Sequence, residues 1–290
     1  MKKLGIVLFS TAILLTGCTA NQNSTTNASS SEAKTSLSAS EQKALDKVTT
    51  EYKAFVQKEI DQLLTDTEKF RDTLKEGKLD EAKKMYPLIR MSYERSEPIA
   101  ESFGESDVKI DFRLADYLDE NKTEEGWSGF HRIEKILWES NTTAGTEKYA
   151  DQLVNDIKEL KAKIATVEVA PDIMLTGAVD LLNEVATSKI TGEEEIFSHT
   201  DLYDFRANIQ GAEKIFELFK PLIAKKDEKL VKSIETEFKN VNSLLDKQMT
   251  DSENYKLYTE LSKEDTKELG EAVTKLGEPL SQMGIILDGK

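Results

Sequence analysis

Apolar positions recur with the period of an α-helix over most of the chain. Between residues 45 and 74, large apolar side chains return every three or four positions, and Gly77 follows the last of them. This spacing puts the apolar residues on one face of a helix, which a glycine commonly ends. The same pattern predicts eight further helices, over residues 79–103, 110–118, 128–139, 146–167, 172–191, 199–219, 227–249 and 262–287.

Signals for β-structure are few. The chain has only five prolines and few alternating apolar runs, so we predict an all-α fold of two antiparallel four-helix bundles. We expect the halves at residues 41–168 and 169–290. Ser198 and Asp201 have the spacing of a capping box for the helix over 199–219, and Pro221 is expected to end that helix.

The first residues have the form of a lipoprotein signal. Lys2 and Lys3 precede a short apolar run, and residues 15–18 read Leu-Thr-Gly-Cys, which is typical of cleavage before Cys18 and lipid attachment to its sulfur. An ordinary signal peptide with a chance cysteine is the alternative. Cys18 is the only cysteine in the 290 residues, which favours the lipid anchor and excludes disulfides and thiolate metal sites.

We therefore expect a signal peptide over residues 1–17, and an acylated Cys18 with a flexible linker over residues 18–40. The linker is rich in serine, threonine, asparagine and alanine, which cannot bury enough apolar surface to fold. The helical domain would then occupy residues 41–290, lipid-anchored at the outer face of the cytoplasmic membrane.

The net charge narrows the class of partner. Residues 1–17 contain two of the 39 basic residues and none of the 54 acidic ones, so the remaining chain carries a formal net charge of −17. This charge argues against nucleic acid and anionic lipid surfaces as partners and favours cations. An acidic surface without any ligand is the commoner reason for such a composition.

His131 and Glu134 are the main candidates for chemistry. They stand three residues apart in a predicted helix, so both side chains can point at one metal ion. A half-buried histidine beside a surface glutamate is the alternative. The sequence contains no His-Glu-x-x-His motif, no Gly-x-Ser-x-Gly elbow and no phosphate-binding glycine loop, and a pairing of Ser128 with His131 is a weak candidate for catalysis.

Two further acidic places lie elsewhere in the sequence. Pro98 should kink the predicted helix near Glu94 and Glu97, and a kink can turn a carboxylate inward, although surface positions are the simpler interpretation. Glu195 ends a run of three glutamates before a helix start, where a side chain can reach across a cleft. His199 in the same stretch is more typical of a helix start than of a metal ligand.

Three separated segments, 93–101, 126–134 and 198–214, together resemble the imelysin-like lipoproteins of the EfeO/EfeM type. Those proteins are extracytoplasmic iron-binding components of the Efe iron-uptake system. The resemblance extends from about residue 41 to the C-terminus and implies paired four-helix bundles with a metal site in the cleft. No cupredoxin domain precedes the helices, so the chain resembles the short form of the family.

The resemblance also implies a set of metal ligands and partners. His131 and Glu134 match the family's His-x-x-Glu directly, and Glu97 falls in a matching segment. Glu195 and Asp151, the latter early in the following helix, are our further candidates. The implied cargo is iron, as Fe²⁺ or Fe³⁺, with zinc or copper binding in vitro, and the implied partners are an iron permease and a haem-type peroxidase.

These observations leave three functions open. We expect a non-enzymatic lipoprotein that captures iron and delivers it to a permease. The first alternative is a metal-dependent peptidase of the imelysin type, in which His131 and Glu134 would hold a catalytic metal with an activated water. The second is a structural helical lipoprotein without a ligand.

Overall fold

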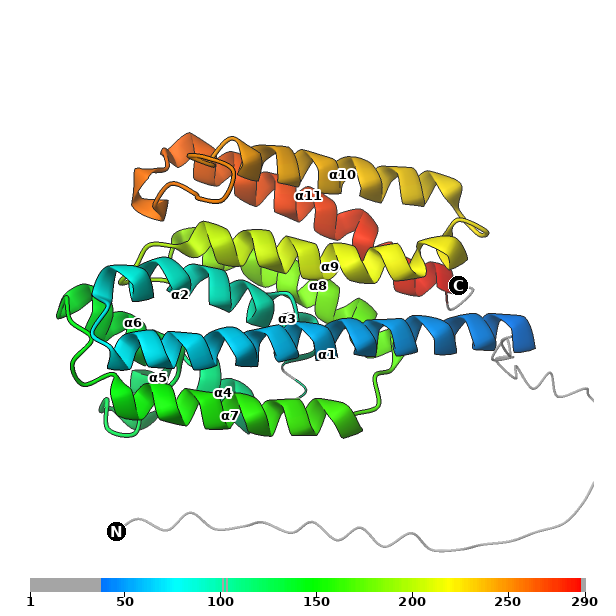
Figure 1. The fold of residues 1–290 in the computed structure, drawn as a ribbon. Helices are drawn as coiled ribbons and strands as arrows, with labels where there is room; N and C mark the ends of the chain where they lie inside the picture. The colour runs from blue at the N-terminus through cyan, green and yellow to red at the C-terminus, as the bar shows by residue number, and fades with distance from the viewer. Residues whose placement is uncertain (1–37, 101, 103, 288–290) are drawn as a thin grey trace, which may run out of the picture. The chain divides into compact units, whose positions relative to one another are not determined.

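A computed structural model describes residues 38–100, 102 and 104–287, and it is helical almost throughout (Figure 1). The predicted signal peptide, Cys18 and most of the predicted linker lie outside these residues. No strand occurs in the described part of the chain, apart from an isolated bridge between Met249 and Tyr255. Among the described helices, none combines the length and apolar character that crossing a bilayer requires. The predicted all-α class is confirmed.

The first bundle is built on three long helices, α1 (Ala39–Lys75), α2 (Leu79–Glu94) and α7 (Glu147–Thr166). Helix α1 packs on both α2 and α7. Its buried apolar side chains repeat at intervals of three, four and seven residues and include Tyr52, Val56, Ile60 and Leu63. Ser38 and Glu41 close a capping box at its start, so the helix begins within the predicted linker.

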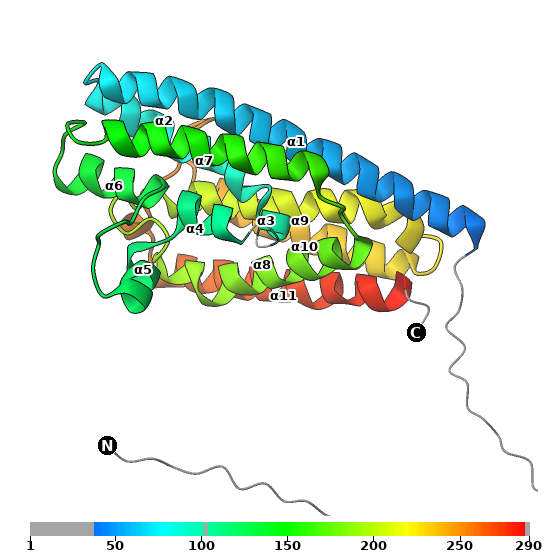
Figure 2. The ribbon, with the colours of Figure 1, turned by 90° about the horizontal axis from the view of Figure 1, so that it is seen from below.

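Short helices take the fourth place in this bundle. They are α3 (Glu97–Ala100), α4 (Glu105–Asp111), α5 (Leu114–Asn121) and α6 (Phe130–Glu139). Figure 2 shows α4 and α6 beside α7, which they contact. The long helices thus support a set of short segments whose ends reach the interior.

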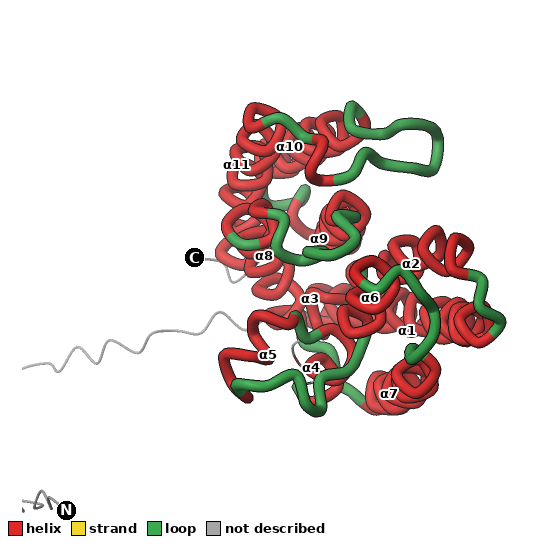
Figure 3. Tube along the Cα trace, turned by 90° about the vertical axis from the view of Figure 1, so that its left-hand side faces the viewer, coloured by secondary structure: helices red, strands yellow, loops and turns green. Residues whose placement is uncertain are grey.

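The second bundle consists of α8 (Pro171–Thr187), α9 (Asp201–Ile223), α10 (Glu228–Asp246) and α11 (Lys263–Leu287). Two single turns, η2 (Lys189–Thr191) and η3 (Tyr258–Glu260), lie in the connections. Each helix packs on two neighbours in a closed ring, and successive helices alternate in direction (Figure 1). Figure 3, viewed end-on, separates this group from the first bundle.

The two bundles join where α2 packs on α9 and α3 packs on α8. Glycines permit this close approach, because a Cβ atom at Gly177 would lie 1.9 Å from the carbonyl oxygen of Pro98. A Cβ at Gly211 would lie 2.6 Å from that of Arg95. The predicted division between residues 168 and 169 falls in the link between α7 and α8, and the described residues of both bundles form one compact unit.

Two predicted helices are interrupted. The helix over 79–103 breaks after Glu94, because Pro98 has no amide hydrogen for the Glu94 carbonyl, which accepts from Asn208 Nδ2 instead at 3.2 Å. The helix predicted over 110–118 is split between the end of α4 and the start of α5. Phe112 is extended between α4 and α5, and its carbonyl accepts a 2.7 Å hydrogen bond from the indole of Trp127. Both breaks place polar side chains at helix ends in the interior.

Candidate metal centre

Helix α6 carries the His131–Glu134 pair into the interior between the bundles. The His131 side chain is 2% exposed and that of Glu134 is fully buried. His131 Nδ1 lies 3.2 Å from Glu134 Oε2, as expected for residues three apart on one helical face. Gly129 begins the helix with φ +88° and lies against the carbonyl oxygen of Ile110, a position that no other residue fits.

The turn before α9 brings a second group of atoms to this pair. The backbone amides of Phe197 and Ser198 donate to Glu134 Oε1 at 3.0 and 2.7 Å. Glu195, also fully buried, places Oε1 3.8 Å from His131 Nδ1. His131, Glu134 and Glu195 each offer one ligand atom, and these atoms lie within 4.8 Å of one another. The predicted three residues therefore meet from two separate segments.

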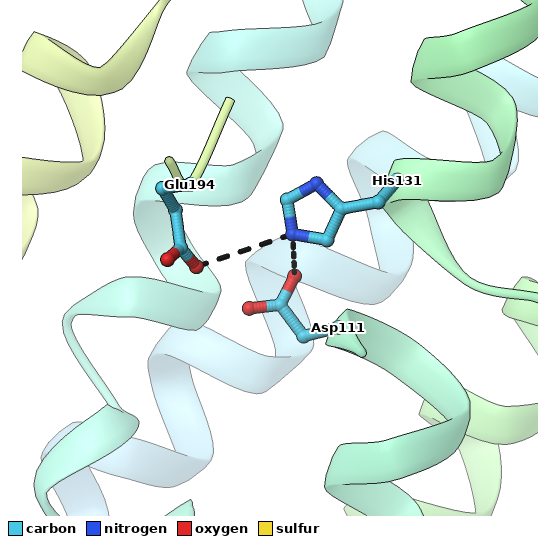
Figure 4. A group of neighbouring side chains, drawn as sticks. All are labelled: Asp111, His131 and Glu194. Carbon is cyan, nitrogen blue, oxygen red and sulfur yellow. Dashed lines mark ion pairs between the residues drawn. The ribbon is translucent and has the colours of Figure 1, made fainter. Parts of the chain in front are cut away.

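The other nitrogen of the imidazole faces two carboxylates that the sequence did not indicate. Asp111 Oδ1, at the end of α4, lies 3.5 Å from His131 Nε2, and Glu194 Oε1 lies 3.9 Å from it (Figure 4). Nε2 is buried and accepts or donates no hydrogen bond among the described residues. These three residues form a second group with ligand atoms within 4.8 Å. Both ring nitrogens thus face carboxylate oxygens.

Two buried cations balance part of this negative charge. Arg90 of α2 contacts Glu94 and Asp111, and Lys189 of η2 lies 3.0 Å from both Glu94 Oε2 and Glu97 Oε1. Burial alone would raise the pKa of Glu94, but Lys189 and Arg90 outweigh burial and lower it. Glu94 is therefore held as the charged partner of both cations.

The carboxylates beside His131 have shifted pKa values. Burial raises the pKa of Asp111 to about 6, although Arg90 and His131 oppose the shift. Burial and the nearby charge of Glu134 raise the pKa of Glu195 well above its ordinary value. Glu134 differs: burial is outweighed by its hydrogen bond to His131 and by a backbone amide, so its pKa is lowered. The buried carboxylates outnumber the two buried cations, and such an excess favours a bound cation.

A pocket of about 100 Å³ leads from the surface to the site. It is lined by Arg113 and the first turn of α5, by residues 193, 194, 196 and 197, and by His131 and Glu134. None of the residues of α5 is buried. Arg113 Nη1 at the pocket lies 2.9 Å from Glu193 Oε1 and 3.4 Å from Glu194 Oε2. The buried site therefore has an approach under a lightly packed helix.

The remaining predicted residues lie elsewhere. Glu97 joins the buried polar cluster through Lys189 and Asn208, but it belongs to neither group around His131. Asp151 is not brought to the site: its side chain is 50% exposed on α7 and pairs with Lys75 at 2.6 Å. Cys18 lies outside the described residues.

The predicted capping box at residues 198–201 is also wrong. Thr200 is the residue before α9, without a side-chain cap. The Ser198 hydroxyl instead lies 2.8 Å from both Glu195 Oε2 and Thr200 Oγ1. His199 takes the left-handed conformation, with φ +59°, and is not part of the site. This segment therefore holds Glu195 and Glu134 in place. Pro221, expected to end the helix, lies inside α9, which continues to Ile223.

Sequence reasoning missed Asp111, Glu194 and Arg90. Asp111 lies inside a stretch predicted as continuous helix, so its position at a helix end was hidden. Glu194 directly precedes the predicted Glu195, and the run of three glutamates was the available signal. Arg90 lies in an amphipathic helix where a basic residue is normally solvated. One imidazole with several carboxylates is a donor set suited to first-row metals such as iron, manganese or zinc.

Comparison with known proteins gives a consistent result. The Imelysin family model, Peptidase_M75, matches residues 48–283. An Efem/EfeO family lipoprotein of Staphylococcus haemolyticus (strain JCSC1435) is 50% identical over 289 residues, covering 99% of this chain and 100% of the relative. Efem/EfeO family lipoproteins of Staphylococcus aureus, strains MSSA476 and NCTC 8325, are each 51% identical over 245 residues, 84% of this chain and 86% of each relative. The chain belongs to the imelysin family and, within it, to the Efem/EfeO family lipoproteins.

Proposed function

We propose that this lipoprotein is the extracytoplasmic iron-binding component of an Efe-type uptake system, which captures iron and delivers it to a permease. One observation supports this most strongly: a buried imidazole faces carboxylates on both of its ring nitrogens. Asp111, Glu134, Glu194 and Glu195 reach it from α4, α6 and the turn before α9. Burying so many carboxylates is costly unless a cation compensates them.

The pocket under α5 supplies the route for the cargo. Incoming iron meets Glu193, Glu194 and Asp116 at the pocket before it reaches His131. Ligation requires deprotonated carboxylates and an imidazole nitrogen with a free lone pair, so capture releases protons where carboxyl pKa values are raised. Unloading follows the reverse exchange, with ligands of the recipient replacing those of the site.

The anchor and the partners complete the proposal. A diacylglycerol on Cys18 would hold the protein at the outer face of the cytoplasmic membrane, since two acyl chains suffice for stable attachment. Residues 18–37 would link the anchor to α1. The recipient is an iron permease, and a haem-type peroxidase of the same system is the second partner.

The test is iron binding by purified protein, measured by calorimetry with Fe²⁺ under anaerobic conditions. Replacing His131 and Glu134 together by alanine should lower the affinity at least about a hundredfold, because one nitrogen and one oxygen ligand are lost. Asp151→Ala is the matched control, since it removes an exposed carboxylate away from the site, and its affinity should equal that of the wild type. Circular dichroism should show the same helical content in all three proteins.

Two outcomes would reject the proposal. Unchanged iron affinity in the double variant would place the site elsewhere. Hydrolysis of peptides by the wild type, lost with a chelator and lost in the double variant, would favour the peptidase implied by the family model's name. A peptidase additionally needs an open metal position and a base near it.

A further inference from the structure

Arg90 lies at the centre of the same carboxylates that face His131. Its side chain is fully buried, and it comes from α2. Its Nε atom lies 2.5 Å from Glu195 Oε1, and its Nη1 atom pairs with Asp111 Oδ1. Nη2 lies 2.5 Å from Glu94 Oε1. One guanidinium thus contacts three carboxylates from three segments.

The guanidinium and the imidazole share individual oxygen atoms. Asp111 Oδ1, paired with Arg90, is the oxygen 3.5 Å from His131 Nε2. Glu195 Oε1, next to Arg90 Nε, is the oxygen 3.8 Å from His131 Nδ1. Glu194 Oε1 lies 3.7 Å from Arg90 Nη2 and 3.9 Å from His131 Nε2. An ion bound to His131 would therefore share its carboxylates with Arg90.

Shared carboxylates of this kind are the framework of two-metal sites. In such sites two ions about 3.5–4 Å apart are held around common ligands, and helical bundles supply carboxylates for both. The oxygens of five carboxylates lie within 3.7 Å of Arg90 nitrogens, which is enough for a second hard cation: Glu94, Asp111, Glu194, Glu195 and Asp204.

We propose that the guanidinium of Arg90 occupies the place of a second metal ion, so that Arg90 limits the site to one captured ion and positions Asp111 and Glu195. This inference rests on the proposed function. Arginine suits the role, because its charge is permanent and its planar fork contacts several oxygens at once. The cluster also holds carboxylate oxygens that could bind a further cation. Both oxygens of Asp204 are buried without a hydrogen bond to any described group.

Arg90→Met tests the proposal, because methionine keeps an unbranched apolar stem and removes the guanidinium with its charge. Arg90→Lys keeps the positive charge but removes the planar guanidinium that contacts several oxygens. Arg206→Met is the matched control: Arg206 of α9 also pairs with a carboxylate, Asp246, but lies outside the cluster. Mn²⁺ is the probe, since it suits the carboxylate-rich cluster and gives an electron paramagnetic resonance signal. Calorimetry gives the number of ions per chain.

The wild type and Arg206→Met should each bind one Mn²⁺. Arg90→Met should bind two, and its resonance spectrum should show the broadened signal of a coupled manganese pair. Arg90→Lys should stay at one ion, with an affinity about tenfold weaker, because a point charge fixes Asp111 and Glu195 less firmly. A purely structural Arg90 would change stability in these variants but not the number of bound ions.

One bound ion in Arg90→Met, with an uncoupled spectrum, would overturn this inference and leave the proposed function standing. No bound ion in the wild type, with Mn²⁺ or with Fe²⁺, would overturn both. If Arg90→Met lacks the helical content of the wild type, the number of bound ions and the resonance spectrum are measured on Arg90→Met combined with Glu94→Gln. That double variant removes one buried charge of each sign and so keeps the net buried charge of the wild type.

Discussion

In α9, the half beside the metal centre and the half farther along are both buried, but their side chains differ. The first half buries Asp201, Asp204 and Asn208, whereas the second buries only apolar side chains such as Ile215, Phe216 and Phe219. The same helix therefore stabilises the fold at one end and carries polar groups at a cost in stability at the other. Burial alone does not separate a core from a site; the chemistry of the buried atoms does.

A substitution in the apolar half of α9 should have the largest effect on the free energy of unfolding. Phe216 stacks on Phe238 of α10, with ring centroids 5.7 Å apart. Phe216→Ala should lower the free energy of unfolding by about 3–5 kcal/mol, because it removes buried area and leaves a cavity. Urea unfolding measures this. Iron affinity of the folded variant should be unchanged, and a changed affinity would show that the two halves are coupled.

Asn208 gives the corresponding change in the polar half. Its Nδ2 group donates to Glu94 Oε2 at 2.8 Å and to Glu97 Oε2 at 2.6 Å, besides the Glu94 carbonyl. Asn208→Ala should cost about 2–3 kcal/mol, because buried acceptors lose their donor. Unlike Phe216→Ala, it should also weaken iron binding, as Glu94 holds Arg90. An effect on unfolding alone would contradict the link between this half of α9 and the site.

Replacing Asp201 should change the free energy of unfolding least, and, unlike the two substitutions above, it should raise it. Burial raises its pKa to about 6, while the unfolded value is near 3.8. Between pH 4 and pH 6 the folded protein keeps a proton that the unfolded chain releases, so this residue lowers the stability as the pH rises. Asp201→Asn, which retains an acceptor for the Glu195 amide, should therefore raise the stability of the metal-free protein by roughly 1–2 kcal/mol at pH 7.5.

The pH dependence provides the control for Asp201→Asn. At pH 4 the carboxyl is largely protonated in the folded protein, and the variant should unfold at nearly the wild-type temperature. A gain in stability of equal size at pH 4 and pH 7.5 would assign the effect to packing and not to the charge. Thermal unfolding of the metal-free proteins at both pH values separates the two.

The sequence predicted the helices well where burial is continuous and failed where backbone polar groups find unusual partners. The period of apolar residues gives α1, α7 and α10, because packing on one face determines them. The break at Phe112 depends on a hydrogen bond from Trp127, 15 residues away, and no local pattern contains it. Pro98, by contrast, is a local signal, and the break it predicted is present.

The residues of the site divide in the same way, into those that a local pattern predicts and those that only packing brings together. Glu134 was predictable because its partner lies three residues away on the same helix. Asp111 and Glu194 meet His131 only through packing of α4 and the turn before α9 against α6, which the sequence does not encode locally. Asp151 shows the opposite failure: its place early in the helix after the motif made it a candidate, but it lies on the exposed face of α7 and pairs with Lys75.

The metal centre is held by backbone amides on one side and by side chains on the other. Glu134 is held by the backbone of Phe197 and Ser198, whereas Glu194 pairs with Arg113 at the pocket and with the buried Lys189. Under the proposed function, the ligands would release the ion in a set order. Glu194, held by side chains, would release it first, and Glu134, held by backbone amides, would release it last.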